Sequence, residues 1–333
     1  MRFPEPFLAA HGFGAAAREP LPADASHRRY ARLRGGPRPA LLMDAPPPED
    51  VRSFADLARH LLAAGLSVPE VLAEDPEAGF LLVEDFGDGT HAGLLDAGCD
   101  PAPLYEEAAE ALAALHAAPP PPGLPRWDAD AMAKATAATF LDWWWPAALG
   151  ADPSPAVRAG LDAALHATLA PFAAARGIVH RDFFPANLMR LPDRQGARRT
   201  GILDFQDAAL GHPAYDVASL VEDARRDVGP AVRRAALARY LALRPGLDRG
   251  EFLGALAAHG APRHLRVASL WVRLARRDGK PRYMEHGPRC WALLDRALSQ
   301  PACAPLRDFL DAEVPRPMRR YPAAAVHPVE GSE

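Results

Sequence analysis

The sequence predicts an α+β fold of two lobes, a small β-sheet N-lobe followed by a larger, mainly helical C-lobe. The chain has 333 residues, which is more than one hydrophobic core usually organises. Its first quarter holds short apolar runs bounded by Pro, Gly and Asp, a pattern typical of strands. After Gly89 the pattern changes to long Ala- and Leu-rich segments with helical periodicity. We place the N-lobe at residues 1–88, the C-lobe at 89–313 and a tail at 314–333.

The N-lobe is expected to contain a small sheet interrupted by one helix. Between residues 50 and 64, apolar residues such as Val51, Phe54 and Leu57 recur every three or four positions, which predicts a helix. Gly35 and Gly36 indicate a turn between the first two strands. The predicted strands are Tyr30–Leu33, Ala40–Met43, Val68–Ala73 and Gly79–Glu84.

The C-lobe is expected to be mostly helical. Only Gly177–Val179 and Thr200–Phe205 resemble strands, and they flank the segment that is richest in closely spaced polar residues. The predicted helices are Pro103–Ala117, Ala129–Leu149, Pro155–Ala175, Pro230–Leu243, Glu251–His259, Pro262–Arg277 and Pro288–Leu298.

Composition excludes several classes of function. The formal net charge is −4, so the chain lacks the basic excess that nucleic-acid binding exploits. Its three cysteines are far apart and without CxxC spacing, which argues against a disulfide framework or a zinc site. No apolar run reaches the length of a membrane span or a signal peptide. We therefore expect a cytoplasmic protein with neither nucleic acid nor membrane as partner.

Three side chains in the polar segment have the chemistry needed for phosphoryl transfer. That reaction needs a carboxylate to orient an alcohol and accept its proton, and oxygen ligands to hold Mg²⁺ against the phosphates. Asp182 and Asn187 follow an apolar strand at a spacing that lets both face one cleft. If the strands Gly177–Val179 and Thr200–Phe205 pair, Asp204 arrives beside Asn187, and both offer the oxygen atoms that a hard cation prefers.

These residues carry a family resemblance. The run from His180-Arg181-Asp182 to Asn187 resembles the catalytic loop of the protein-kinase-like superfamily, in the form used by aminoglycoside phosphotransferases. Leu203-Asp204-Phe205-Gln206 stands in place of the metal-binding DFG segment. Other segments are similar to bacterial anomeric kinases of N-acetylmuramate and N-acetylglucosamine, with the similarity running from about Asp24 to about Trp291. These segments are Ala25–Tyr30, Leu42–Pro47, Leu82–Asp88 and Arg276–Pro281.

This resemblance implies a two-lobed protein-kinase-like fold and a reaction. The γ-phosphate of ATP would be transferred, with Mg²⁺, to the C1 hydroxyl of a free N-acetylated sugar, giving an α-1-phosphate for cell-wall recycling. Asp182 would be the catalytic base, with Asn187 and Asp204 as the Mg²⁺ ligands. The backbone of a hinge would meet the adenine, and the hinge residues are Glu84, Asp85 and Phe86.

The chain departs from the superfamily at the phosphate-binding lysine. The predicted strand Ala40–Met43 has no lysine, and the helix after it offers Asp56 but no glutamate partner. Arg28 or Arg29, beside a predicted phosphate-covering turn that ends at Ser26, could supply the charge through a guanidinium fork. Because successive strand residues face opposite ways, we expect only one of the two arginines to point inward.

Five further residues are assigned to the substrate or to structural support. Asp207 either contacts the substrate or caps the next segment. Arg273 and Arg276 belong to a basic region whose simplest interpretation is a solvated helix face, but which could meet an anionic substituent of the sugar. His180 and Asp216 are expected to support the catalytic loop through hydrogen bonds.

Two other functions stay open. A kinase of the same fold acting on an aminoglycoside, choline or homoserine would use the same loop chemistry. A pseudokinase that binds nucleotide and serves as a scaffold would explain the missing lysine, although the intact set of Asp182, Asn187 and Asp204 argues against it. No GxxxxGK followed by Ser or Thr occurs, which excludes a P-loop ATPase. We expect a monomer with a small-molecule amino-sugar substrate.

Overall fold

The computed structural model describes residues 3–22, 28–47, 49–174 and 176–319. It contains two compact packing units. Unit 1 comprises Met1–Pro122 and Phe184–Asp207, and unit 2 comprises Gly123–Phe183 and Ala208–Glu333. The lobe borders after residues 88 and 313 remain predictions, because packing units and lobes divide the chain differently. Most of the predicted tail lies outside the described residues.

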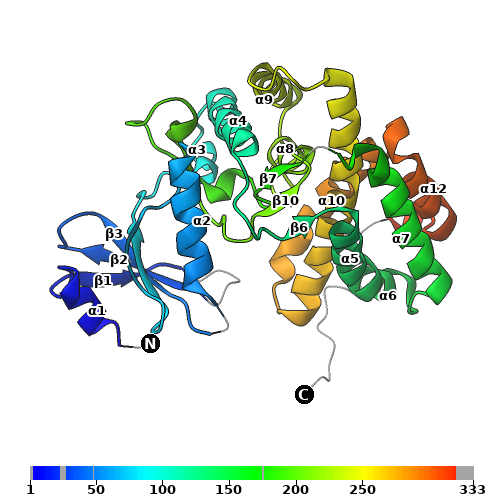
Figure 1. Ribbon diagram of the computed structural model, residues 1–333. Helices are drawn as coiled ribbons and strands as arrows, with labels where there is room; N and C mark the ends of the chain where they lie inside the picture. Colours follow the sequence, from blue (N-terminus) through cyan, green and yellow to red (C-terminus); the bar gives the residue numbers. More distant parts are fainter. Residues whose placement is uncertain (1–2, 23–27, 48, 175, 320–333) are drawn as a thin grey trace. The chain divides into compact units, whose positions relative to one another are not determined.

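Unit 1 is built on a five-stranded antiparallel sheet with strand order β1-β2-β3-β5-β4 (Figure 1). The two central strands, β3 and β5, are buried almost throughout. The four predicted strands are confirmed to within a few residues, whereas β1 was missed because all its residues are exposed. The strands are β1 (Ala17–Pro20), β2 (Arg29–Arg34), β3 (Ala40–Asp44), β4 (Val71–Asp75) and β5 (Phe80–Glu84).

Helices and one hairpin complete unit 1. The predicted helix is confirmed as α2, whose apolar side is buried and whose first turn is capped by Asp50, which accepts the Arg52 N–H at 2.9 Å. Phe7 and Leu8 of α1 pack into a core with Phe80 and Leu82 of the sheet. The elements are α1 (Glu5–Ala10), α2 (Val51–Ala63), α3 (His91–Asp96), α4 (Pro101–Ala117), β8 (Leu188–Arg190) and β9 (Thr200–Ile202).

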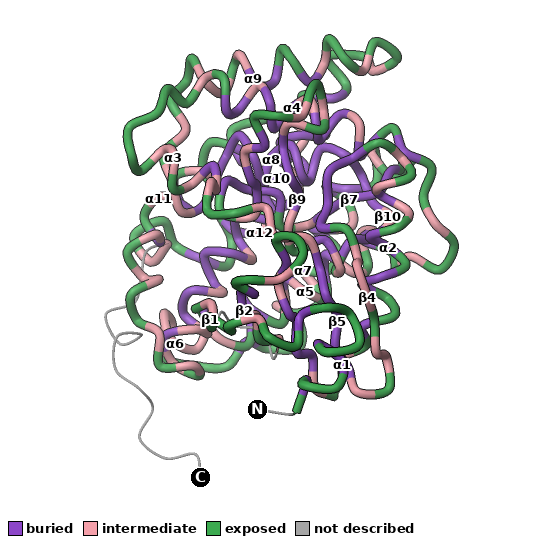
Figure 2. The backbone as a smooth tube through the Cα atoms, turned by 90° about the vertical axis from the view of Figure 1, so that its left-hand side faces the viewer, coloured by how far each residue is buried: buried purple, intermediate pink, exposed green. Residues whose placement is uncertain are grey.

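Unit 2 is mainly helical and is organised around α10, which packs against α5, α8 and α11. A small sheet with strand order β6-β10-β7 lies beside these helices. Every residue of α8 is buried (Figure 2). The strands are β6 (Arg126–Trp127), β7 (Gly177–Val179) and β10 (Ala209–Gly211). The helices are α5 (Ala129–Thr139), α6 (Trp145–Leu149), α7 (Pro155–Leu169), α8 (Ala214–Val221), α9 (Pro230–Ala242), α10 (Arg249–Arg277), α11 (Gly287–Leu298) and α12 (Ala304–Glu313).

Three of the predicted helices are corrected. Glu251–His259 and Pro262–Arg277 form one helix, α10, with Pro262 inside it. Proline removes one backbone hydrogen bond, at a cost of about 3 kcal/mol, but α10 is buried on both sides of this position and packing holds it together. The predicted helix Ala129–Leu149 is interrupted by a π-helical turn at Phe140–Trp144. No helix within the described part of the chain is long and apolar enough to cross a membrane.

Candidate active site

The first group of candidate residues lies in the loop after β7, within unit 2. Strand β7 is buried and ends at Val179, so His180, Arg181 and Asp182 leave the small sheet together. Asp216, in the first turn of α8, accepts the backbone N–H of His180 at 2.5 Å and that of Arg181 at 2.8 Å. Arg181 has a φ of 77°, a left-handed conformation that is costly for any residue other than glycine. A buried carboxylate thus holds a strained turn directly before Asp182.

The His180 imidazole faces the interior, with a relative exposure of 1%. Its Nδ1 accepts the backbone N–H of Asp182 at 3.3 Å. The edge of the ring meets Phe183, with centroids 5.7 Å apart at an interplanar angle of 84°. This arrangement suits a residue that positions the loop.

Two arginines, Arg181 and Arg266, lie near the exposed residue Asp182. The Arg266 guanidinium of α10 donates to the Tyr215 hydroxyl at 3.2 Å. Burial alone would lower the pKa of Arg266, but Tyr215 and Asp182 together raise it above its ordinary value. The guanidinium carbons of Arg181 and Arg266 lie 4.1 and 5.9 Å from the centroid of the Trp127 ring. The loop therefore presents its carboxylate beside fixed positive charge.

The second group lies in unit 1, at the open end of the hairpin of β8 and β9: Asn187 directly precedes β8, and Asp204 follows β9. The pairing of Gly177–Val179 with Thr200–Phe205, on which the position of Asp204 was made conditional, does not form: β7 pairs with β10, and the shorter β9 pairs with β8. The outcome for Asp204 is nevertheless similar, because Leu203 N–H donates to the carbonyl of Asn187 at 2.9 Å just before Asp204. Asp204 has a φ of 58°, and its Oδ1 accepts from Gln206 Nε2 at 2.7 Å.

Asn187 and Asp204 line a cavity of about 680 Å³ within unit 1. Its apolar wall includes Leu42, Val83 and Phe54, and Phe54 packs on Phe205 with ring centroids 4.7 Å apart. Tyr30 adds a hydroxyl whose pKa is raised to about 12, mainly by burial and further by Asp204, against an opposing effect of Arg28. The polar end therefore offers an amide, a carboxylate and a neutral phenol. The remaining charged lining groups are Arg18, Arg28, Arg29 and Asp44.

Both arginines proposed in place of the missing lysine line this cavity, although only one was expected to point inward. The alternation rule does not apply to the pair, because Arg28 precedes β2 and Arg29 is its first residue. Arg28 is held by Glu49, with its Nε 2.9 Å from the Glu49 carboxylate. Arg29 is exposed and pairs in register with Asp44 across the sheet. Ser26 lies outside the described residues.

The predicted hinge residues do not line the cavity with their side chains. Glu84 accepts from Arg194 at 2.5 Å. Asp85 forms a buried ion pair with Arg32, whose Nε lies 2.6 Å from its carboxylate. Phe86 packs against Gly201, where an added Cβ would meet its ring at 2.8 Å. The three side chains hold the hinge segment itself, which leaves backbone atoms as the groups available to a ligand.

The three predicted substrate contacts lie in both units. Asp207 is exposed at the end of unit 1. Arg273 and Arg276 are half-buried on α10 in unit 2, on the helix that also carries Arg266. Burial and the nearby Arg277 lower the pKa of Arg273. The described residues contain no cluster of three or more His, Cys, Asp or Glu side chains that could hold a metal.

Two residues near the loop were not assigned a site role from the sequence. Trp127 follows a Pro-rich segment, and its strand is too short to show any periodicity. Arg266 lies one heptad before Arg273, so helical spacing could have grouped the two on one face. Which face meets the catalytic loop depends on how α10 packs against α8, and no local pattern encodes that contact.

Solved structures with the same fold include members of two kinase groups. A thermostable mutant of aminoglycoside phosphotransferase APH(4)-Ia matches with a TM-score of 0.60 at 21% identity, covering 89% of this chain and 100% of that one. A choline/ethanolamine kinase family protein of Mesorhizobium loti matches with a TM-score of 0.60 at 18% identity, covering 91% and 95%. The predicted two-lobed, protein-kinase-like α+β fold is confirmed.

Sequence comparison specifies the family. Residues 17–253 match the phosphotransferase enzyme family. An N-acetylmuramate/N-acetylglucosamine kinase of Caulobacter vibrioides is 41% identical, covering 94% of this chain and 96% of that one. A kinase of the same name from Pseudomonas aeruginosa is 37% identical, covering 92% of each. The chain belongs to the phosphotransferase enzyme family, as the resemblance predicted, and is an enzyme that transfers a phosphoryl group to an alcohol.

Proposed function

We propose that this chain is an ATP- and Mg²⁺-dependent sugar 1-kinase. It phosphorylates the anomeric hydroxyl of N-acetylmuramate, N-acetylglucosamine or both, giving the α-1-phosphate for recycling of cell-wall sugars. The observation that carries the proposal is the cavity of about 680 Å³ that combines an apolar wall with Asn187, Asp204 and two arginines. Such a lining suits a nucleotide, which has an apolar base at one end and phosphates at the other. The names of the relatives at 41% and 37% identity supply the sugar.

Asp182 acts as the catalytic base in this proposal. It orients the C1 hydroxyl and accepts its proton while the hydroxyl oxygen forms a bond to the γ-phosphorus. The bond between that phosphorus and the bridging oxygen breaks at the same centre, and its electrons leave with ADP. The strained Arg181 and the two hydrogen bonds to Asp216 fix the direction of the loop. Alignment of this kind is a main source of rate in phosphoryl transfer.

Asn187 and Asp204 are the residues that would hold Mg²⁺. An amide oxygen and a carboxylate are the donors this ion prefers, and Mg²⁺ commonly takes only one or two carboxylates, with substrate phosphates and water completing its shell. The described segments contain no larger acidic cluster, and a site with one carboxylate is sufficient for this ion. When bound, the ion would neutralise charge on the phosphates.

The remaining assignments follow from the same proposal. Arg28 and Arg29 bind phosphate, together with Ser26, and the backbone of the Glu84–Phe86 hinge meets the adenine. Asp207, Arg273 and Arg276 contact the sugar, and His180 supports the loop. We propose residues 1–88 and 89–313 as the two lobes, and a cytoplasmic monomer as the working form, since ATP is a cytoplasmic substrate.

The direct test is ³¹P NMR of the full chain with ATP, Mg²⁺ and each sugar, with Asp182→Ala in parallel. A sugar 1-phosphate signal that appears only with the unmodified protein is the expected result. Phosphate appearing on another alcohol, such as choline or an aminoglycoside, would overturn the sugar assignment. Nucleotide binding without transfer to any acceptor would point instead to a scaffold that has lost activity.

A further inference from the structure

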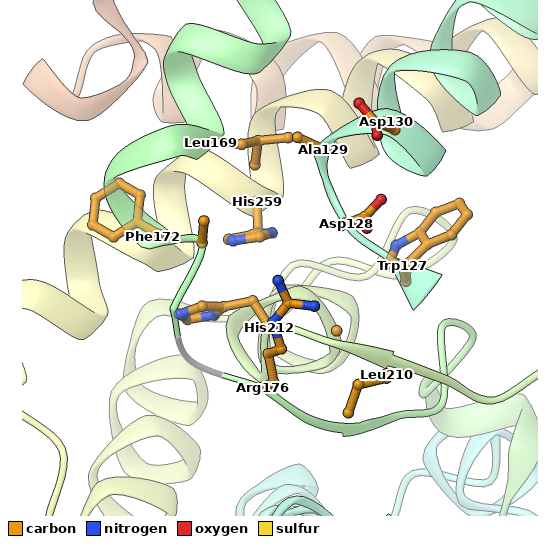
Figure 3. A pocket seen from close by; sticks show the side chains of 12 residues that line it. Trp127, Asp128, Ala129, Asp130, Leu169, Phe172, Arg176, Leu210, His212 and His259 are labelled. Carbon is orange, nitrogen blue, oxygen red and sulfur yellow. The ribbon is translucent and has the colours of Figure 1, made fainter. Parts of the chain in front are cut away.

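A second cavity, of about 180 Å³, lies within unit 2 and includes none of the proposed catalytic residues. It opens to solvent and is lined by the start of α5, the end of α7, strand β10 and the middle of α10 (Figure 3). Leu169, Phe172 and Leu210 form its apolar wall. The polar side chains that turn toward the same space are Trp127, Asp128, Arg176, His212 and His259.

The most unusual member of this lining is His259. Its side chain is 5% exposed, and neither ring nitrogen has a hydrogen-bond partner within the described structure. Burial, and secondarily His212, lower its pKa well below the ordinary value. The His212 ring stacks on it, with centroids 4.5 Å apart. A neutral imidazole has one donor and one acceptor, and leaving both unused in the interior costs free energy.

Three more side chains of the lining can form hydrogen bonds to a ligand. Trp127 Nε1, a donor, is buried and has no partner among the described atoms. Arg176 is exposed, and the described part of the chain places no carboxylate within ion-pair distance of it. Asp128 Oδ1 accepts the Ala131 N–H at 3.3 Å as the cap of α5, and its Oδ2 lies 3.9 Å from Nη1 of the exposed Arg126. A carboxylate has about four lone-pair positions, so Asp128 can accept a further hydrogen bond. The remaining charged side chain of the lining, Asp130, is already paired with His166 at 2.8 Å.

We propose that this cavity binds a small α-amino acid with an apolar side chain. The carboxylate of the ligand accepts from Arg176 and Trp127 Nε1, and its ammonium group donates to Asp128 and to one ring nitrogen of His259. The apolar wall receives the side chain. A cavity of about 150 Å³ holds benzene, so 180 Å³ admits a molecule of about the size of leucine. A zwitterion is favoured over a simple anion because it can pair with the buried donor of Trp127 and with the acceptor nitrogen of His259 together.

The same site touches the catalytic loop through one side chain. The Trp127 ring that borders the cavity carries the Arg181 guanidinium on its face at 4.1 Å, and Arg181 precedes Asp182. Trp127 also meets Tyr215 edge-on, with centroids 5.6 Å apart. A ligand that accepts a hydrogen bond from Trp127 Nε1 would hold the Trp127 ring in place, and with it the surface on which the Arg181 guanidinium rests. This link to turnover rests on the proposed function, whereas the binding site does not.

Binding is tested on the ¹⁵N-labelled full chain, using the Trp127 indole N–H resonance, which is assigned by its loss in Trp127→Phe. Leucine is the probe, and its two matched controls are 4-methylpentanoate, which lacks the ammonium group, and 3-methylbutylamine, which lacks the carboxylate. We expect a saturable shift with leucine at a Kd of about 1 mM or below, and at least about tenfold weaker binding of each control. No shift with leucine overturns the site. Equal binding of 4-methylpentanoate overturns the zwitterion.

Variants locate the ligand. Arg176→Gln and Asp128→Asn should each weaken leucine binding by about tenfold. Arg234→Gln, which changes an exposed arginine on α9, should leave it unchanged. His259→Leu should also weaken binding while the protein stays folded, because the nitrogens it removes have no partner. Undiminished binding in all three site variants would place the ligand elsewhere.

The link to the loop has its own readout. Leucine should change the rate of sugar phosphorylation at saturating substrate by about twofold or more in the unmodified protein, and should not do so in Arg176→Gln. Leucine binding without any change in rate overturns the link and leaves the site intact. A chain that binds leucine but phosphorylates no sugar contradicts the proposed function alone.

Discussion

The candidate residues in the two units are held in place by different means. In unit 1, Asn187 and Asp204 sit on a hairpin whose strands are close in sequence, and backbone hydrogen bonds set their separation. In unit 2, Asp182 depends on Asp216 of α8 and lies beside Arg266 of α10, both distant in sequence. The residues proposed to bind Mg²⁺ are therefore locally encoded, whereas the proposed catalytic residue depends on how helices pack. Substitutions far from the reaction should harm the catalytic loop more than the hairpin.

The largest expected effect distinguishes the proposed catalytic base, Asp182, from the proposed Mg²⁺ ligand, Asp204. Asp182→Asn should lower kcat by about 10²–10⁴-fold, the usual contribution of a catalytic base, with the KM for ATP unchanged. Asp204→Asn should instead raise the Mg²⁺ concentration needed for half-maximal rate. Steady-state kinetics across ATP and Mg²⁺ concentrations measure both, with Asp193→Asn, an exposed carboxylate between β8 and β9, as control. A rise in the Mg²⁺ requirement for Asp182→Asn would contradict the division of roles.

The next effect tests how the loop is held. Asp216→Ala leaves the backbone N–H groups of His180 and Arg181 without their buried acceptor. At about 1–3 kcal/mol for each buried unsatisfied donor, the free energy of unfolding should fall by about 2–6 kcal/mol. Urea denaturation measures it, with Asp295→Ala, an exposed aspartate of α11, expected to stay within about 0.5 kcal/mol of the unmodified protein. A similar small change in Asp216→Ala would show that the loop does not need its carboxylate.

The buried carboxylate of Glu222, which follows α8, is paired with His264, Arg233 and Arg296. This network predicts that the stability of unit 2 falls in acid. Burial by itself would raise the pKa of Glu222. The hydrogen bond with His264 at 2.7 Å and the charges of Arg233 and Arg296 outweigh that effect, so the pKa falls to about 2. Because this lies below the ordinary value of 4.5, the carboxylate stabilises the fold fully above pH 4.5 and loses that effect as the pH falls toward 2. The contribution is on the order of 3 kcal/mol.

Urea midpoints of the unmodified protein and Glu222→Gln, measured from pH 7 to pH 3, test this network. The difference in stability between the two should be large at pH 7 and shrink at the acid end. A difference that stays constant over this range would mean that Glu222 stabilises the fold through its packing and not through its charge.

The same contrast explains what the sequence could predict. The spacing of apolar residues predicts strands β3 and β5 and helix α2. Asp182, Asn187 and Asp204 lie close enough together in the sequence to be recognised as a set. β1 could not be predicted, because its four residues are exposed and show no alternation. The continuity of α10 through Pro262 and the position of Arg266 beside the loop depend on tertiary packing. Local sequence pattern therefore suggests candidate catalytic and metal-binding residues, but it does not show which distant residues hold them in place.

The smallest effect concerns Arg28 and Arg29, the arginines proposed to replace the missing lysine. Arg28 is tied to Glu49, whereas Arg29 is exposed at the cavity and has greater freedom to meet a phosphate. Arg29→Met should therefore raise the Kd for ATP by about tenfold, within the range for one charge-assisted contact, and Arg28→Met by less. Calorimetric titration with ATP measures both, and Arg34→Met, an exposed residue of the same strand, is the control. If Arg28→Met weakens ATP more than Arg29→Met does, Glu49 orients the phosphate-binding arginine rather than competing for it.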